Sequence, residues 1–373
     1  METVEATSWW HTIRSKFWNE WFWLPRHLTW QDYLNKKQGM YKPQTEDLLW
    51  VPVLALALCL TRILFERYIA TPIGKSLGIR EINHRKPSPS IYLEEAFKKS
   101  RTPSHQALES YSKKLDLSVR QIQRWFRLRR NQEKANTLTR FTESCWRFTY
   151  YFTILIIGTI ILYNKVWFWD STECWPNYPH QHVPSEIYWY YLVELSYYVG
   201  SSLMHFTDVR KKDFWELFIH HIVTMTLMFI AWIQNIIRIS CLILLVHDMA
   251  DPFLEATKMA SYSGHRKWCN HLFIVFTIAW YIGRLYIFPF KILYSTLFYA
   301  PTVTGMAPIY YLYNGLLGSL QLLHIIWTVI ITKILYNRLK TGEIKKDERS
   351  ESEEPVSDTE TETAQKSAVN NCT

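Results

Sequence analysis

Long apolar segments separated by short polar ones dominate this sequence of 373 residues. Each apolar segment has about 20 residues, enough for a helix to cross the ~30 Å hydrocarbon core of a bilayer. The pattern predicts an all-α, polytopic membrane protein with about seven transmembrane helices. We expect these helices at residues 48–68, 141–163, 187–206, 214–233, 236–253, 268–293 and 309–336.

One long polar region, residues 75–140, interrupts the apolar pattern and is predicted to fold as a small soluble insert of three helices. Pro103 separates its first helix from its second, and Ser118 with Gln121 fits a capping box at the start of the third. Its apolar positions recur at helical spacing: Leu93, Phe97, Leu108, Leu115, Ile122, Trp125 and Phe126.

The two ends of the chain differ from the apolar middle. Residues 1–47 place many Trp residues between charges, and Trp favours the membrane–water boundary. This segment is predicted either to lie on the membrane as an interfacial helix that ends near Pro25 or to pack as an aromatic cap on the helices. Residues 337–373 are polar and acidic, so we expect a disordered tail.

Three hydroxyl residues of the tail, Ser350, Ser357 and Thr359, each have Glu three positions later. This spacing is typical of phosphorylation sites for an acidic-directed kinase such as casein kinase 2. The alternative is that the acids only keep the tail soluble.

The formal net charge is +9, and Lys and Arg concentrate in segments 75–147, 209–212, 258–267 and 333–346. With seven membrane helices, all four segments fall on one side. The positive-inside rule makes that side cytosolic and the N-terminus lumenal. The loops 164–185 and 294–308 are then expected in the lumen, and the C-terminus in the cytosol.

Ionisable residues break the apolar pattern most strongly in segment 208–258, which predicts two helices with almost no loop. His220 lies six residues into the first helix, about 9 Å deep at the helical rise, and Asp248 lies at a similar depth in the second. Such groups are costly inside a membrane, so they indicate a functional site. The set comprises His220, His221, His247, Asp248, Asp251 and Glu255, the last three at i, i+3, i+7 spacing on one face.

Imidazole beside carboxylate in a dry site supports two kinds of chemistry. The carboxylate can orient a histidine as a general base, or a histidine can act as a nucleophile and form an acyl intermediate. A metal site is not expected, because the sequence has no HxxxH or HxxHH grouping and no CxxC pair. The residues could instead join two helices as a polar network, which is the role predicted for the isolated Glu194, Arg284 and His324.

The hairpin resembles the Lag1 motif of ceramide synthases, within the wider TLC-domain proteins. The insert, with its Trp125-Phe126 pair and the basic run that follows, resembles a homeodomain and the inserts of animal ceramide synthases. Leu128 stands where homeodomains have the asparagine that reads adenine, so sequence-specific DNA binding is not expected. The motif matches Asp208, Lys212, Asp213, Phe214, His220, His221, Asn235, Arg238, His247, Asp248, Asp251, Glu255 and Lys258.

The resemblance implies a multi-pass N-acyltransferase of the endoplasmic reticulum that joins a fatty acyl-CoA to the amine of a sphingoid base, giving ceramide or dihydroceramide. It implies no cofactor, because acyl-CoA is a substrate. Membrane lipids are expected neighbours, and a homodimer or a heterodimer with related synthases is compatible with the family.

The resemblance also implies roles for individual residues. We expect His220 to accept the acyl group, Asp248 to orient a histidine, and His221 or His247 to move protons, with Asp251 nearby. Direct attack by the amine, with a histidine as base, remains the alternative. The substrate-binding residues expected are Lys212, Asp213, Asn235, Arg238, Glu255 and Lys258. Acyl-chain length is expected to be selected in segment 294–308, with Tyr294, Phe298, Pro301 and Pro308.

A basic rim at the expected cytosolic side could bind the phosphates of CoA, or it could serve only as the topology signal. The rim consists of Arg210, Lys211, Lys212, Lys258, Arg266 and Lys267.

Two functions of other classes compete with catalysis. One is a non-catalytic TLC-domain protein that senses lipids, against which the intact His220, His221, Asp248 and Asp251 argue. The other is a membrane-tethered DNA-binding regulator, against which Leu128 argues.

Overall fold

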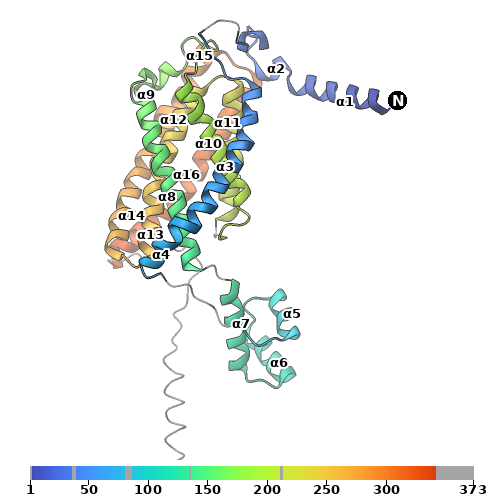
Figure 1. Ribbon diagram of the computed structural model, residues 1–373, viewed down its shortest axis with the longest axis vertical. Coiled ribbons are helices and arrows are strands. Elements are labelled where there is room, and N and C mark those ends of the chain that lie inside the picture. Colours follow the sequence, from blue (N-terminus) through green and yellow to red (C-terminus); the bar gives the residue numbers. More distant parts are fainter. Residues whose placement is uncertain (1, 36–38, 80–85, 134–135, 211–212, 342–373) are drawn as a thin grey trace, which may run out of the picture.

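The computed structural model describes residues 2–35, 39–79, 86–133, 136–210 and 213–341. Throughout these ranges the secondary structure is helical, which confirms the predicted all-α polytopic fold (Figure 1). The helical segments long and apolar enough to cross a membrane are Thr45–Ser76, Val119–Leu162, Phe214–Ile233, Arg266–Thr304 and Pro308–Lys340. The count of seven spans stays a prediction, since the segments near 187–206 and 236–253 fall outside this set.

The long helices stand side by side in one bundle (Figure 1). The insert lies at one end of the bundle, here named the insert end, and the N-terminal segment lies at the other, the cap end. The bundle helices are α3 (Trp50–Phe65), α4 (Thr71–Ser76), α8 (Thr137–Leu162), α10 (Ser185–Met204), α11 (Phe214–Ile233), α12 (Ile237–Asp248), α13 (Asp251–Tyr262), α14 (Arg266–Trp280), η5 (Tyr281–Leu293) and α16 (Pro308–Thr341).

Close packing joins α10 to α3. A Cβ atom on Gly200 would lie 3.1 Å from Sγ of Cys59 and 3.4 Å from the carbonyl oxygen of Ala55, so the glycine allows the close approach. Small residues at helix contacts let backbones come together in membrane bundles. The same interior holds the fully buried Tyr191 and Trp232, which fix α10 against α11.

Two expected boundaries were wrong. The segment expected to be one helix at 236–253 forms α12 and α13, which are separated after Asp248. Pro252 lies in the first turn of α13, where its missing N–H costs nothing but where it cannot continue the preceding helix. The loop expected at 294–308 is mostly helical, in η6 (Ser295–Tyr299) and α15 (Ala300–Thr304).

The last helix also ends later than predicted. α16 runs to Thr341, so the first residues of the segment expected to be disordered are helical. The remainder of that tail, with Ser350, Ser357 and Thr359, lies outside the described residues.

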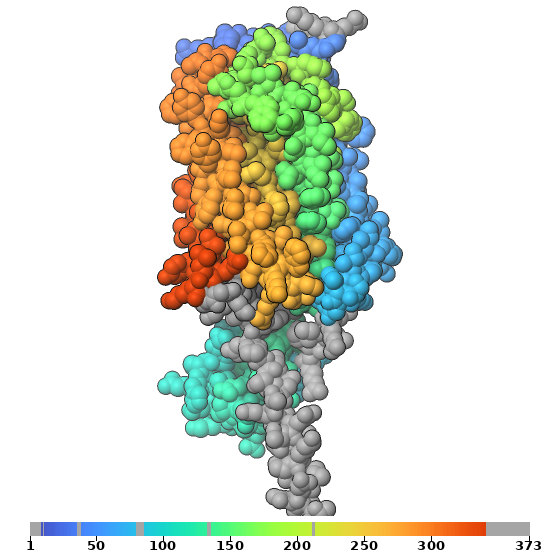
Figure 2. Space-filling model, turned by 90° about the vertical axis from the view of Figure 1, so that its left-hand side faces the viewer, coloured from blue at the N-terminus to red at the C-terminus, as the bar shows by residue number. Residues whose placement is uncertain are grey.

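The insert folds as three helices, α5 (Ile91–Lys99), α6 (His105–Leu115) and α7 (Val119–Glu133), and forms a lobe of its own (Figure 2). The predicted capping box is confirmed: Ser118 N donates to Gln121 Oε1 at 2.8 Å, and Gln121 N donates to Ser118 Oγ at 3.2 Å. The core of the lobe contains Leu93, Phe97, Leu108, Ile122, Trp125 and Phe126.

Part of the basic character of α7 serves the insert itself. Arg129 Nε donates to both carboxylate oxygens of Glu94, at 2.9 and 3.1 Å, and its guanidinium lies 4.9 Å from the ring centre of Phe97. Arg130 donates to the carbonyl oxygen of Arg101 at 2.9 Å. These two arginines are therefore used to hold α7 against the rest of the lobe.

At the cap end, aromatic residues of the N-terminal segment close the bundle. Trp23 is buried, and Trp30 Nε1 donates to the carbonyl oxygen of Trp18 at 2.9 Å. The hydroxyl groups of Tyr33 and Tyr178 lie 2.6 Å apart, and burial raises the pKa of both phenols, so both stay protonated. This is the aromatic-cap alternative, whereas α1 (Glu2–Phe17) leaves the bundle sideways and its interfacial role stays a prediction (Figure 1).

Candidate active site

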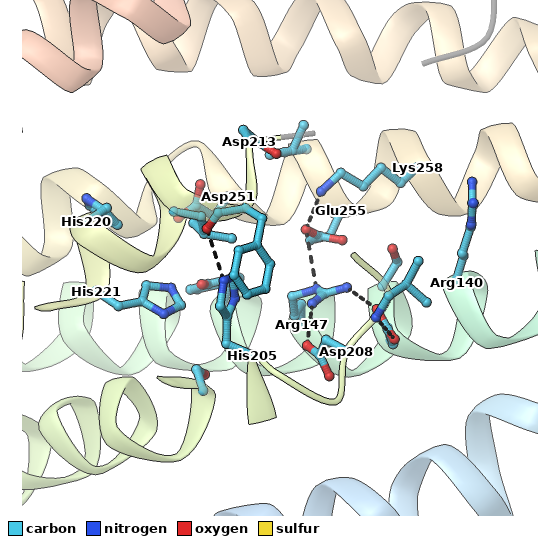
Figure 3. A pocket seen from close by; sticks show the side chains of 18 of the residues that line it. Arg140, Arg147, His205, Asp208, Asp213, His220, His221, Asp251, Glu255 and Lys258 are labelled. Atoms are coloured by element: carbon cyan, nitrogen blue, oxygen red, sulfur yellow. Dashed lines mark hydrogen bonds and ion pairs between the residues drawn. The ribbon is translucent and has the colours of Figure 1, made fainter. Parts of the chain in front are cut away.

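A cavity of about 170 Å³ opens among the bundle helices on the side of the insert end. It reaches from His220 and His247 to Arg140 and Lys258, so it joins the histidines to a basic mouth (Figure 3). Its other lining residues include Arg62, Glu143, Arg147, Tyr151, Tyr197, Tyr198, His205, Asp208, Arg210, Asp213, His221, Asp251, Glu255, Trp280, Arg284 and Trp327.

The two histidine-bearing helices meet at matched depth, as the spacing predicts. The rings of His220 on α11 and His247 on α12 lie nearly parallel, with centres 6.3 Å apart and 24° between their planes. Trp327 of α16 packs edge-on against His220 at 5.5 Å. Nδ1 of His220 is buried and has no hydrogen-bond partner, so this imidazole is not committed to a structural bond through that atom.

His221 occupies the other side of the same turn of α11. It lies edge-on to His205 at 5.7 Å and to Tyr198 at 6.1 Å. His205 is held in place because its Nε2 donates to the carbonyl oxygen of Phe214 at 3.1 Å. The cavity is thus lined by histidines from α10–α11 and α12 together.

Arg284 of η5 stabilises the break between α12 and α13. Its guanidinium donates to the carbonyl oxygen of His247, one of the carbonyls that a helix end leaves without a partner. It also lies 3.7 Å from Asp251 Oδ2 and over the ring of Trp280. A cation at the end of α12 and an anion at the start of α13 both match the helix dipoles.

Asp248 has a different environment from the one the sequence predicts. It is fully buried, as is Glu194 of α10, it lies outside the cavity lining, and neither of its carboxyl oxygens has a hydrogen-bond partner. Glu194 accepts the hydroxyl of Tyr150 at 3.3 Å. No hydrogen bond joins the carboxyl group of Asp248 to a histidine, and its role in orienting one stays a prediction.

An ionic network fixes the mouth of the cavity (Figure 3). Arg147 of α8 pairs with Asp208 at 3.2 Å, with Glu143 at 2.9 Å and with Glu255 at 3.7 Å. Arg62 of α3 pairs with the same Asp208 at 2.5 Å. These pairs tie α3, α8 and α13 to the segment that leads into α11, so the arginines balance buried carboxylates.

Three further cations line the mouth: Arg140, Arg210 and Lys258. Lys258 Nζ lies 2.6 Å from Glu255 Oε1, and Arg210 lies over the ring of Phe214 at 4.9 Å. Together they give one end of the cavity a positive surface that suits phosphate groups.

Other residues of the predicted basic rim are not placed there. Arg266 and Lys267 are exposed in the first turn of α14, outside the lining, and Lys211 and Lys212 lie outside the described residues. Over the ranges that the structure describes, no group of three or more His, Cys, Asp and Glu side chains is arranged to hold a metal ion.

Comparison with known proteins assigns the chain to a family. The TLC domain family matches residues 140–333, and the homeodomain family matches residues 87–135. Human ceramide synthase 5 is 41% identical over 94% of this chain and 90% of the relative, and human ceramide synthase 4 is 39% identical over 94% and 89%. Ceramide synthase hyl-1 of Caenorhabditis elegans is 30% identical over 91% and 84%. The chain belongs to the ceramide synthase family.

Two of the motif residues that resemble those of ceramide synthases lie far from the cavity. Asn235 lies at the cap end in the turn between α11 and α12, about 22 Å along α11 from His220, and Arg238 lies in the first turn of α12. Asn235 has φ 51° and its amide donates to the carbonyl oxygens of Pro179 and Gln181, at 2.8 and 3.0 Å. Both residues are outside the cavity lining because the hairpin carries them to the opposite end of the bundle, where Asn235 holds the turn. Their role in substrate binding stays a prediction.

The segment expected to select chain length in this ceramide synthase family member lies at the cap end as well. Tyr294 and Phe298 are exposed on the outside of the bundle, with ring centres 5.2 Å apart. A second cavity, of about 50 Å³, is lined instead by the inward residues Thr296, Ala300, Thr304, Gly305 and Ala307, together with Trp23, Trp175 and Tyr313.

Several site residues were missed by sequence reasoning. Arg62, Glu143 and Arg147 were given no role in the site, and Arg284 and His324 were predicted only to join helices as polar contacts. The sequence does show that each of these residues is a polar or charged group within or next to a predicted span. It does not show which other helix that side chain contacts.

Proposed function

We propose that this protein forms ceramide or dihydroceramide by transferring the acyl group of a fatty acyl-CoA to the amine of sphingosine or sphinganine. Membership in the ceramide synthase family supports ceramide synthesis in general. The observation that carries the finer proposal is the cavity that links His220 and His221 to a mouth lined by Arg140, Arg210 and Lys258. A lipid acyl chain and a polyphosphate headgroup need these two environments in one place.

In the first half of the proposed reaction, a ring nitrogen of His220 attacks the thioester carbonyl carbon. The carbon–nitrogen bond forms, the carbon–sulfur bond breaks, and CoA leaves as a thiolate. The proton on the other nitrogen of the attacking imidazole passes through His221 to the thiolate. The product of this half is a neutral acyl-imidazole and free CoA.

In the second half, the neutral amine of the sphingoid base attacks the same carbonyl carbon. The amide bond forms, the bond to His220 breaks, and the amine proton returns to the imidazole through His221. The alternative is direct attack of the amine on the thioester with His220 as base, which needs no covalent intermediate.

The surroundings of the site support three further parts of the proposal. Arg140, Arg210 and Lys258 bind the CoA phosphates from the cytosolic side of the endoplasmic-reticulum membrane, and the N-terminus is lumenal. The acyl chain extends from His220 toward the cap end. Its length is then selected where segment 294–308 closes the bundle, by the inward Thr296, Ala300 and Thr304 and not by the outward Tyr294 and Phe298.

Purified protein supplied with sphinganine and a series of acyl-CoAs tests the function, with product measured by mass spectrometry. We expect ceramide with a restricted set of chain lengths. No product with any acyl-CoA would leave the chain as a non-catalytic family member.

Acyl-CoA alone tests the two mechanisms. Under the acyl-imidazole mechanism the intact protein gains the mass of one acyl group, and a His220→Ala variant gains none. Turnover of both substrates without any adduct in rapidly quenched samples would favour direct attack.

A further inference from the structure

His247 lines the cavity, yet both of its ring nitrogens are used inside the protein. Nδ1 lies 2.6 Å from the carbonyl oxygen of Ile243, one turn earlier on α12. Because a carbonyl can only accept, Nδ1 carries the hydrogen and donates it. Nε2 lies 3.1 Å from Nε2 of His324 on α16. With both rings neutral, Nε2 of His247 carries no hydrogen, so it accepts the hydrogen on Nε2 of His324.

The surroundings of His324 leave its hydrogen bond to His247 as its polar contact. It is fully buried and lies behind His247, outside the cavity lining. Phe288 packs edge-on against its ring at 5.0 Å, and Trp280 does so at 6.1 Å. Its Nδ1 has no hydrogen-bond partner. The bond from Nε2 to His247 is therefore the hydrogen bond that the buried His324 ring makes.

The contact decides which histidines can exchange protons with a substrate. His247 presents no free nitrogen to the cavity. Its ring lies nearly parallel to that of His220, with the ring centres 6.3 Å apart. Trp327 also contacts His220, edge-on at 5.5 Å. His220 and His221 are then the histidines available for proton transfer. His247 contributes by keeping His220 in one orientation.

We propose that His324 is a positioning residue: its Nε2 hydrogen holds His247 in one tautomer and one orientation, and His247 in turn orients His220. The consequence for turnover rests on the function proposed above, whereas the contact itself does not. His324 comes from the last helix of the bundle, 77 residues away from His247, so the site includes α16 as well as the hairpin.

Diethyl pyrocarbonate tests the contact without any turnover, since it acylates imidazole nitrogens that have a free lone pair. Full-length protein in nanodiscs is treated with the reagent, and the histidine peptides are read by mass spectrometry. We expect His247 to stay unlabelled in the wild type while His220 is labelled, and His247 to become labelled in His324→Leu. Labelling of His247 as fast as His220 in the wild type, or an unlabelled His247 in His324→Leu, would overturn the proposal.

Three variants at the same position test the consequence. The amide nitrogen of Gln reaches the place of Nε2 and donates there, whereas that of Asn ends nearer Nδ1 and Leu has no donor. We expect His324→Leu and His324→Asn to lower kcat about 10- to 100-fold with KM for acyl-CoA nearly unchanged, and His324→Gln to recover most of the loss.

A glutamine variant as impaired as the leucine variant, or a leucine variant with the kcat of the wild type, contradicts the positioning role. A wild type that makes no ceramide with any acyl-CoA contradicts the proposed function instead, and the labelling result still decides the contact.

Discussion

The two ends of the α11–α12 hairpin carry polar residues that are used in different ways. At the insert end, His220 borders a cavity of about 170 Å³ and has a buried ring nitrogen without a partner. At the cap end, Asn235 makes two hydrogen bonds to the loop before α10, and Tyr178 donates to Gln234 at 3.0 Å. Both ends belong to the same sequence motif.

The difference separates chemistry from folding within that motif. A polar group that is satisfied by the chain's own backbone has little left to offer a substrate, and its removal costs stability. A group that faces a cavity with unused hydrogen-bonding atoms can serve a ligand, and its removal costs activity. We therefore expect substitutions at the two ends to lower different quantities.

The largest expected effect is at the insert end. His220→Ala should lower ceramide formation by about 100-fold or more, because it removes the proposed acyl acceptor or base. Its melting temperature in detergent should stay close to that of the wild type, since the ring makes no hydrogen bond through Nδ1. Full activity in this variant would remove His220 from the reaction.

At the cap end, Asn235→Ala should lower the free energy of unfolding by about 1–3 kcal/mol, because two hydrogen bonds are lost and Ala is strained at positive φ. Activity per folded molecule should be retained. Asn235→Gly keeps the backbone conformation and isolates the hydrogen bonds, so it should fall between the two in thermal melts. A loss of kcat with unchanged stability would break the comparison of the two ends.

Between the two ends, Gly283 of η5 lets Arg284 reach the end of α12. An added Cβ would lie 2.9 Å from Cε of Met249 and 3.2 Å from the carbonyl oxygen of Val246. Gly283→Ala should therefore cost about 1 kcal/mol of stability and lower activity severalfold, since it displaces Arg284 from His247. The matched control is Gly318→Ala on α16, where an added Cβ has no neighbour within 4 Å, so activity should not change and stability should stay the same or rise slightly through the higher helix propensity of Ala.

The smallest effect is expected in the insert. Arg129→Ala removes the pair with Glu94 and the contact with Phe97, so limited proteolysis should detect a lobe weakened by about 1 kcal/mol. Ceramide formation should not change, and the exposed Arg124→Ala should change neither property. A loss of activity in Arg124→Ala would instead give the exposed face of α7 a role in the reaction.

Periodic features of the chain were predictable because they depend on neighbours in sequence. The helix at Phe214–Ile233 has the expected bounds, and the capping box at Ser118 formed as its spacing indicated. The matched depth of His220 and His247 followed from residue counting along two helices of known rise. The same counting gave the depth of Asp248, but it could not show that this residue lies outside the cavity lining.

Spacing and motifs along the chain were enough to predict the helical, membrane-spanning class, the three-helix insert, the family and the depth of the histidines. Each of these rests on spacing along the chain, which fixes helix faces and lengths. Packing between distant segments was needed to place Asp248 outside the cavity, Arg284 at the end of α12, and His324 against the second nitrogen of His247. A helix face can be read from spacing, but the helix it meets is set by packing between segments far apart in the chain.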